Sequence, residues 1–202
     1  MTIMPSFRRQ ALAARGAGLA ALALTVSACS SDGTTNADKV AEFAAITDWL
    51  EDKFNTAFLE EGAIPSTGTA SFTGYAGVIV GSGAEPLALL GDASIDIDWD
   101  DDTVTGTLDD FFGVEGGAEG DYTGSVAIVN GDFLGNQPNA FTFDYAGTLG
   151  GQGNTIVLDG SGEGILKGTP IAGLFAASNA GETDLLNGVE TDVLLAIAAE
   201  ID

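Results

Sequence analysis

The stretch from Asp96 to Asp102, DIDWDDD, gathers carboxylates that could bind a metal ion. Its alternate aspartates resemble the odd positions of a calcium-binding EF-hand loop, which also requires Gly at the sixth position and Glu at the twelfth. Asp101 and Thr107 occupy those two positions here. Asp100, Asp101 and Asp102 are therefore weak metal candidates, suited to screening calcium at a turn and not to enclosing it.

The residue types that commonly carry out catalysis are scarce. The chain has no histidine, so the commonest general base and the Ser-His and Cys-His pairs of nucleophilic catalysis are missing. Carboxylates are so numerous that no pair stands out as the two acids of a glycosidase. The glycines in 147–154 and 160–164 lack the Lys-Ser/Thr pair of a phosphate-binding loop, and we expect them at turns or barrel corners. The sequence predicts a protein that is not an enzyme and needs no cofactor.

Cys29 is the single cysteine, so the chain offers it no disulfide partner. Three arginines precede an apolar run at 17–26, which is typical of a secretory signal and too short to span a bilayer as a helix. The residues that end at Cys29, LTVSAC, resemble a bacterial lipobox, in which the cysteine receives diacylglycerol and becomes the new N-terminus. We predict lipidation of Cys29; the alternative is ordinary signal peptidase cleavage after VSA.

Lipid on Cys29 would anchor the chain, because each buried methylene contributes about 0.8 kcal/mol and bacterial lipoproteins carry several acyl chains, palmitate among them. Residues 1–28 are then a lipoprotein signal peptide. Residues 29–38 are small and polar after the cysteine, as expected of a flexible tether. Ser30 resembles the residue found in lipoproteins exported to the outer membrane, and retention at the inner membrane is the alternative.

The chain is strongly acidic. It has 6 Lys and Arg against 30 Asp and Glu, a formal net charge of −24, and three of the basic residues lie in the signal segment. Such a charge repels phosphate groups, so we exclude nucleic acid as a partner. It also keeps a protein soluble.

Apolar residues recur at three- and four-residue steps between Val40 and Phe58, with charged residues between them. They form a stripe of Val40, Phe43, Ala44, Thr47, Leu50, Phe54 and Phe58. The pattern predicts an amphipathic helix that ends near Gly62, and residues 39–65 comprise this helix and a connector. We expect the stripe to pack on its own domain; the alternative is that it contacts a partner protein.

After Pro65 the apolar period becomes two, which is typical of strands. ASIDIDW is one such strand, and the run Asp100 to Asp102 is then a hairpin tip. Further alternating segments are separated by the turn signals NGD, GNQP and GGQGN. The final VLLAIAAEI is interpreted as a strand and not a helix, because it could close the sheet. The predicted fold is mainly β: a small eight-stranded antiparallel up-and-down β-barrel preceded by one amphipathic α-helix.

A barrel of an exported protein could also be inserted in the outer membrane. Insertion needs an apolar band with aromatic girdles, but only 8% of the residues are aromatic and the outward positions include Asp96, Asp98 and Asp144. The chain ends in Ile201-Asp202, without the terminal aromatic residue of integral barrels. We therefore expect a soluble barrel filled by its own side chains.

Four stretches carry a resemblance to a known family: GTASFTGYAGVIV, ASIDIDWDDDTVTGTLDDF, GDYTGSVAIVNGDF and GILKGTPIAGLFAASNAGE. Over residues 66–202 they resemble the C-terminal barrel of transferrin-binding protein B and its relatives. In that family the opening strand reads Gly-Thr-Ala-x-Tyr-x-Gly, and the next hairpin includes Thr-x-x-Gly-Thr-Leu. The late strand departs from the family pattern, with Leu174-Phe175 where Phe-x-Gly-Pro is usual.

The resemblance implies a surface-exposed outer-membrane lipoprotein that captures a ligand, related to metal or haem, or docks to an integral outer-membrane protein. The alternative is a structural or interaction lipoprotein of the envelope without a small-molecule ligand. Transferrin itself is not expected, because its recognition in that family uses a larger two-lobed protein. The ligand, its binding residues and the choice between the cell surface and the periplasmic face stay open.

Overall fold

The computed structural model of the chain describes residues 37–38, 41, 45 and 64–202, apart from 82–85, 116–117, 136, 180–181 and 183. The signal peptide and most of the tether and helix predicted before residue 64 lie outside this part. The few described residues before 64 are helical, and the helix as a whole stays a prediction. Over the described residues, we find no helix with the length and apolar character needed to cross a membrane.

The described chain from residue 64 onward is built of β-strands, and it contains these ten. They are β1 (Thr69–Val80), β2 (Leu87–Asp98), β3 (Thr103–Glu115), β4 (Ala118–Leu134), β5 (Gln137–Gly151), β6 (Asn154–Lys167), β7 (Gly173–Ser178), β8 (Leu185–Leu186), β9 (Val189–Glu190) and β10 (Val193–Ile201). The period-two pattern of the sequence therefore predicted the element type correctly.

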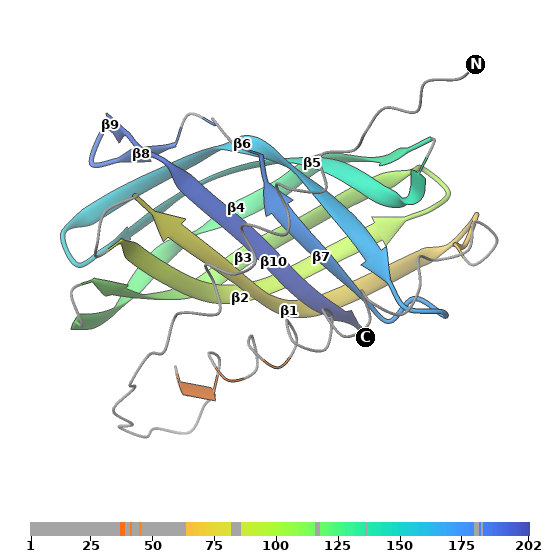
Figure 1. Cartoon of the computed structure of the whole chain (residues 1–202), viewed down its shortest axis with the longest axis horizontal. Helices are drawn as coiled ribbons and strands as arrows, with labels where there is room; N and C mark the ends of the chain where they lie inside the picture. Colours follow the sequence, from red (N-terminus) through yellow and green to blue (C-terminus); the bar gives the residue numbers. More distant parts are fainter. Residues whose placement is uncertain are drawn as a thin grey trace, which may run out of the picture.

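Eight of the strands close into an antiparallel barrel, which they cross obliquely (Figure 1). Their order is β5-β4-β3-β2-β1-β10-β7-β6, and β5 also pairs with β6 along its length. The C-terminal strand β10 pairs with β1 from Phe72 opposite Ile201 to Val80 opposite Val193. The predicted eight-stranded antiparallel barrel is thus confirmed, as is the interpretation of VLLAIAAEI as its closing strand.

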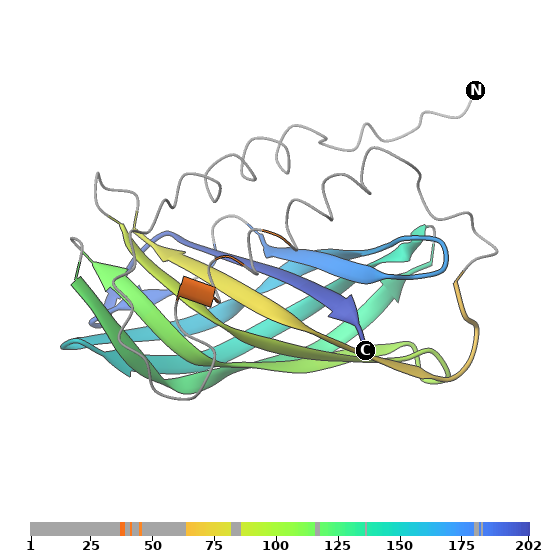
Figure 2. The ribbon, with the colours of Figure 1, turned by 90° about the horizontal axis from the view of Figure 1, so that it is seen from below.

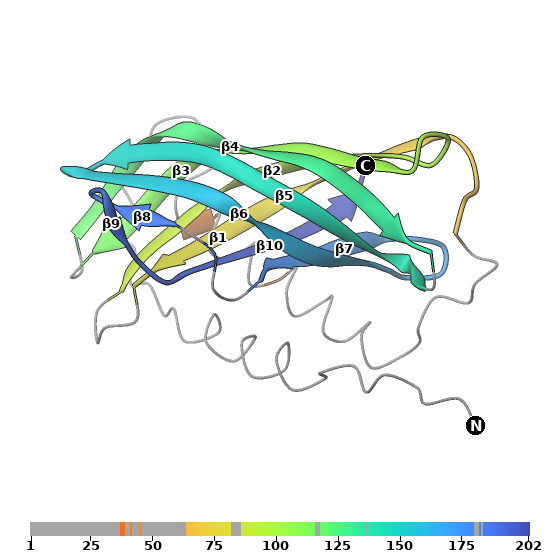
Figure 3. The same ribbon diagram turned by 90° about the horizontal axis from the view of Figure 1, so that it is seen from above.

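The small hairpin of β8 and β9 is an addition that the sequence analysis did not predict. Each strand has two residues, and β8 pairs with Ile156 and Val157 near the start of β6, beside which it lies in Figure 3. Asn187 and Gly188 form the turn, with φ of 54° and 80°. Asn and Gly are the residues that adopt this left-handed conformation most readily. Strands this short have no apolar period to detect.

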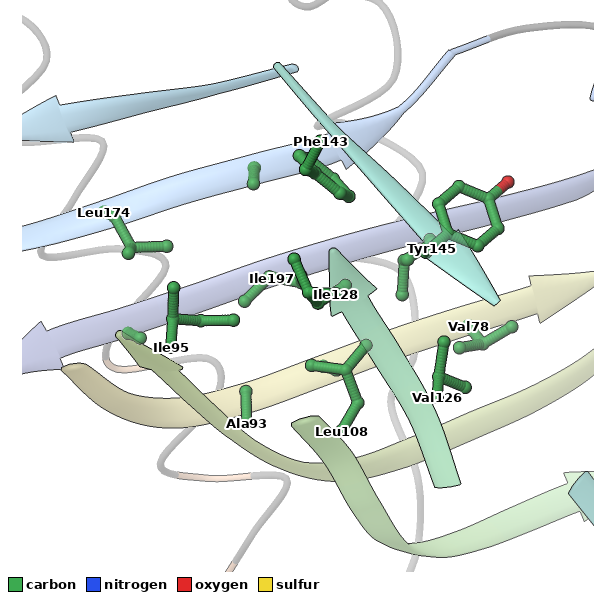
Figure 4. Packing of buried hydrophobic residues seen from close by; sticks show 14 of the residues in the cluster. Val78, Ala93, Ile95, Leu108, Val126, Ile128, Phe143, Tyr145, Leu174 and Ile197 are labelled. Atoms are coloured by element: carbon green, nitrogen blue, oxygen red, sulfur yellow. The ribbon is translucent and has the colours of Figure 1, made fainter. Parts of the chain in front are cut away.

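The barrel interior is filled by side chains that alternate along each strand. Its largest fully buried members include Tyr145, Phe72, Phe111, Phe141 and Phe143. Figure 4 shows side chains from β1, β2, β3, β4, β5, β7 and β10 meeting inside the wall. The interior is therefore a packed hydrophobic core, as expected for an eight-stranded barrel.

Aromatic rings on β5 lie opposite glycines on β6. The register pairs are Phe141 with Gly164, Phe143 with Gly162, and Tyr145 with Gly160. A Cβ atom on Gly162 would lie 2.3 Å from the Cζ atom of Phe143 and 2.6 Å from the main-chain oxygen of Ala177. These glycines lie within a strand and not at a turn, and they leave room for the rings. Of the two glycine-containing segments expected at turns or barrel corners, 147–154 does contain a turn, at Gln152 and Gly153, where φ is positive.

The outside of the barrel has two different sides. We define the polar wall as the exposed outward residues Ser94, Asp96, Thr105, Thr107, Asp109, Thr123, Ser125, Ala127, Asp132, Asp144, Ala146 and Thr148 of β2 to β5. We define the outer apolar face as the outward residues Tyr75, Gly77, Ile79, Ala88, Leu90, Phe112, Phe175, Ala177, Leu194, Ala196 and Ala198, which the register places in adjacent rows. The strands β1 and β10 at the centre of this face run side by side in Figure 2.

Replacing Gly162 by Ala tests the ring-against-glycine packing. We expect Gly162→Ala to lower the free energy of unfolding by about 2 kcal/mol, because the methyl group forces Phe143 or the β7 main chain to move. Gly150→Ala is the matched control, since a Cβ atom there meets nothing within 4 Å. Urea denaturation of both variants measures the difference, and equal stabilities would contradict this packing.

Candidate functional site

A gap in the main-chain hydrogen bonding of the wall lies where β7 stops. Strand β7 pairs with β6 only between Gly162 and Lys167, and with β10 only between Ala196 and Glu200. Beyond Ser178, side chains and short main-chain contacts bridge the neighbouring strands. The Ser178 hydroxyl accepts a hydrogen bond from the Leu195 N–H at 3.0 Å. Polar side chains lie at this gap.

Asp184 fills this gap and is fully buried. Its Oδ1 atom accepts a hydrogen bond from the Asp159 N–H at 3.0 Å, and its Oδ2 atom accepts one from the Tyr145 hydroxyl at 3.3 Å. Its main-chain oxygen accepts a bond from the Thr191 N–H at 3.0 Å. The carboxylate thus satisfies an N–H of β6 that has no strand partner at this point, which is what an edge of a sheet requires.

A second carboxylate lies close to the first. The Ser161 hydroxyl donates to Oε1 of Glu182 at 2.8 Å and accepts from the Asn179 amide at 3.0 Å. We call Tyr145, Asp159, Ser161, Ser178, Glu182 and Asp184 the seam cluster. It joins β5, β6 and β7 to the chain that leads into β8, so it closes the wall where the ladder is interrupted.

Burial perturbs the titration of two members of the seam cluster, Asp184 and Tyr145. Loss of solvent raises the pKa of Asp184 above its ordinary value of 3.8, and the negative charges of Glu182 and Asp159 raise it further, against the effect of its two hydrogen bonds. Burial also raises the pKa of Tyr145, with the Asp184 charge as the next cause. A phenol held in its protonated form is a poor nucleophile or base. The cluster can therefore hold a proton at Asp184, and its phenol is not activated for nucleophilic attack.

The seam cluster predicts a pH dependence of stability. Because the folded protein raises the pKa of Asp184, it binds the proton more tightly than the unfolded chain does. The stabilising contribution of the protonated form is present at low pH and is lost as pH rises from about 3.8 through the raised pKa. Relative to Asp184→Asn, the wild type should lose up to about 1.4 kcal/mol per pH unit in this window.

Urea unfolding at a series of pH values measures this difference. Asp109→Asn, at an exposed position of the polar wall, controls for the removal of one negative charge. If wild type and Asp184→Asn keep the same stability difference at every pH, the protonation assigned to Asp184 is wrong.

The aspartates singled out by the sequence lie where they were expected, at the tip of the β2–β3 hairpin. Oδ1 of Asp98 accepts hydrogen bonds from the N–H groups of Asp100 at 2.9 Å and Asp101 at 3.3 Å, and Oδ2 of Asp100 accepts one from the Gly68 N–H at 3.0 Å. Asp102 has a left-handed φ of 54°. The structure thus gives this run a role in shaping the turn.

Metal binding by Asp100, Asp101 and Asp102 stays a prediction. Across the described part of the chain, we find no group of three His, Cys, Asp or Glu side chains arranged to hold a metal ion. Cys29, the predicted lipidation site, lies outside the described residues.

Sequence reasoning missed both the seam cluster and Lys167. Asp184 follows the polar run NAGET and looks like any other solvated acid, and Tyr145 looks like an ordinary core residue of an alternating strand. Lys167 ends β6 with 4% of its surface exposed, and burial lowers its pKa to about 8. Only the three-dimensional position of these residues reveals their burial, because the local sequence around them has no distinctive pattern.

Comparisons with protein-family models, with curated proteins and with solved structures each give no match. The resemblance to the transferrin-binding protein B barrel is therefore neither supported nor contradicted by them. A fold alone does not imply a function, so a functional conclusion has to come from the residues and surfaces of this chain.

Proposed function

We propose that the chain is a lipid-anchored protein of the bacterial outer membrane, and not an enzyme. Its barrel binds a ligand or an integral outer-membrane partner through its outer surface. The observation that carries the proposal is the position of the single cysteine: Cys29 follows a secretory signal pattern and LTVSA, and precedes a small polar tether. A single cysteine is sufficient for such an anchor, because lipid attachment needs no second thiol.

The packed interior supports recognition on the outside. Large barrels and lipocalin-like barrels hold ligands in an internal cavity, whereas this interior is occupied by buried rings such as Phe72, Phe111 and Phe143. A haem group inside the wall would have to displace these side chains, at a cost of several kcal/mol. A haem- or metal-related ligand would therefore bind at the loops or the wall.

The charge of the surface supports a partner with a basic face. Lys167 is the single Lys or Arg between residues 64 and 202, and it is buried. The polar wall carries Asp96, Asp109, Asp132 and Asp144 among Thr and Ser side chains, all of them exposed. Such a surface attracts cationic patches and repels anionic lipid headgroups.

The polar wall also favours a tethered barrel over an inserted one. An inserted barrel needs apolar residues facing lipid around its whole circumference. Here the outward residues of β3 and β4 include Thr105, Thr107, Thr123 and Ser125.

The alternative function is a structural lipoprotein of the envelope without a small-molecule ligand. The same packed interior favours it. It differs from the first function because it predicts no saturable ligand binding.

Lipid attachment is tested by labelling with palmitate in a bacterial host that processes lipoproteins. We expect the full-length chain to incorporate the label and to fractionate with membranes, and Cys29→Ser to lose both properties because no other thiol is present. Ser30→Ala is the matched control, since it changes a neighbouring side chain and leaves the thiol. Label on Cys29→Ser would contradict the anchor.

Recognition is tested with the Cys29→Ser chain exported without lipid. We expect saturable binding to outer membranes of the source bacterium that weakens as salt rises, because the complementary charges are screened. Asp96→Asn with Asp144→Asn should weaken this binding, whereas Thr105→Ala with Thr148→Ala is the uncharged control on the same wall. Haem, zinc and calcium titrations form the second arm. Absence of saturable binding in both arms would favour the structural alternative.

A further inference from the structure

The outer apolar face contains residues that are buried although they point away from the barrel interior. They are Ala88, Leu90, Phe112, Ala196 and Ala198, and none of them belongs to the core cluster inside the wall. Their exposed fractions range from 0% for Ala198 to 6% for Ala88 and Leu90. The register makes them one patch, because Gly77 lies opposite Leu90 on one side and opposite Ala196 on the other.

The opposite side of the barrel provides a direct comparison. Ala127 on β4 and Ala146 on β5 lie opposite each other, also point outward, and are exposed. Ala196 and Ala198 have the same side chain and the same orientation relative to the wall, but they are 1% and 0% exposed. A methyl group on the outside of a sheet is buried this fully only when something covers the sheet. The group that covers the sheet therefore lies on the side of β1 and β10.

We propose that residues 39–58 of this chain pack as an amphipathic helix across the outer apolar face. The stripe in this segment supplies Phe43, Leu50 and Phe54 at helical spacing, with acidic residues on its other side. Gly77, Ala196 and Ala198 have small side chains or none, so the face is recessed around them. Large side chains of a helix can fit there.

Length and connection match this placement. A helix of 20 residues is about 30 Å long, and a strand of 12 residues such as β1 is about 40 Å long. Five residues separate the end of the segment at Phe58 from Ile64, which packs against the core just ahead of β1. The connection is therefore short, and the segment reaches the face of the strand that it precedes without crossing the barrel.

The chemistry of the face also matches this segment. The rows through Gly77 and Ile79 are uncharged on β2, β1 and β10. Burying an isolated carboxylate there would cost several kcal/mol. The segment can meet the face with Phe43, Leu50 and Phe54, while Glu42, Asp48 and Asp52 stay in water.

The packing limits how far the barrel can stand from its anchor. Ala37 and Asp38 are helical as well, so with residues 39–58 held on the wall only residues 30–36 remain as a free tether, and these span at most about 25 Å. This consequence rests on the proposed lipid attachment at Cys29, whereas the packing itself does not. The two can therefore fail independently.

Thiol accessibility tests the packing in the Cys29→Ser chain, which contains no other cysteine. Ala198→Cys and Ala127→Cys are made separately and labelled with a maleimide. We expect the thiol at position 127 to react at the rate of a free thiol, and the thiol at position 198 to react about 100-fold more slowly, because a local opening must precede the reaction. Fast labelling at position 198 would overturn the proposal.

Changes in the segment identify what covers the face. Leu50→Asp with Phe54→Asp places two charges in the stripe and should bring labelling at position 198 to the rate at position 127. Ala45→Asp with Thr56→Asp adds the same charge elsewhere on the segment, where Ala45 is exposed, and should leave labelling slow. If position 198 stays protected with the stripe disrupted, another occupant covers the face and the proposal is wrong. Protection that rises with protein concentration would identify a second copy.

A measurement without substitutions in the segment or the barrel tests the proposal even if these variants fail to fold. Amide hydrogen exchange of the Cys29→Ser chain should show residues 43–58 protected, since packing on the barrel stabilises a helix that would be marginal alone. Complete exchange of this segment within seconds, with β1 and β10 still protected, would overturn the proposal as well.

Discussion

Closure of the sheet is the constraint on which the rest of the structure depends. A barrel of eight strands has an interior just wide enough for side chains, so every inward residue must share a small volume with residues from the opposite wall. The rings of Phe141, Phe143 and Tyr145 fill that volume only because the adjacent strand β6 has glycines at the opposing positions. The high glycine content is thus a packing requirement of this core as well as a source of turns.

Closure also explains the position of the buried polar groups. Strand β7 is too short to cover β6 and β10 along their whole length, so main-chain groups near Asp159 need other partners. Asp184 supplies one, and Tyr145 links it to the core. A buried carboxylate is costly, and here its cost is offset by hydrogen bonds that complete the wall. We therefore regard the seam cluster as part of the architecture and look for recognition on the outer surface.

Much of the barrel could be predicted from the sequence, because alternation such as that of ASIDIDW identifies a strand with one buried face. The closing role of VLLAIAAEI followed from counting strands and their edges. The strands of the β8–β9 hairpin are too short to show a period, and the Asn187-Gly188 pair, a common hairpin turn, is the one signal of it in the sequence. The seam cluster was hidden: which acid lies at a gap in the wall depends on where β7 ends, and that is set by three-dimensional packing. The predicted Cys29 and amphipathic helix rest on sequence patterns that lie outside the described residues.

The division of the exterior connects the fold to the proposed function. One side presents acids and hydroxyls to solvent, and the outward residues of the other are apolar and largely buried, so the barrel has a single polar side on which to meet a charged partner. We propose that lipid on Cys29 holds this barrel at a membrane. Mass spectrometry of the mature N-terminal peptide from native membranes distinguishes the two possible states of this cysteine. We expect a peptide that begins at Cys29 with diacylglycerol on its thiol, and a mature peptide with an unmodified Cys29 would show that the proposal is wrong.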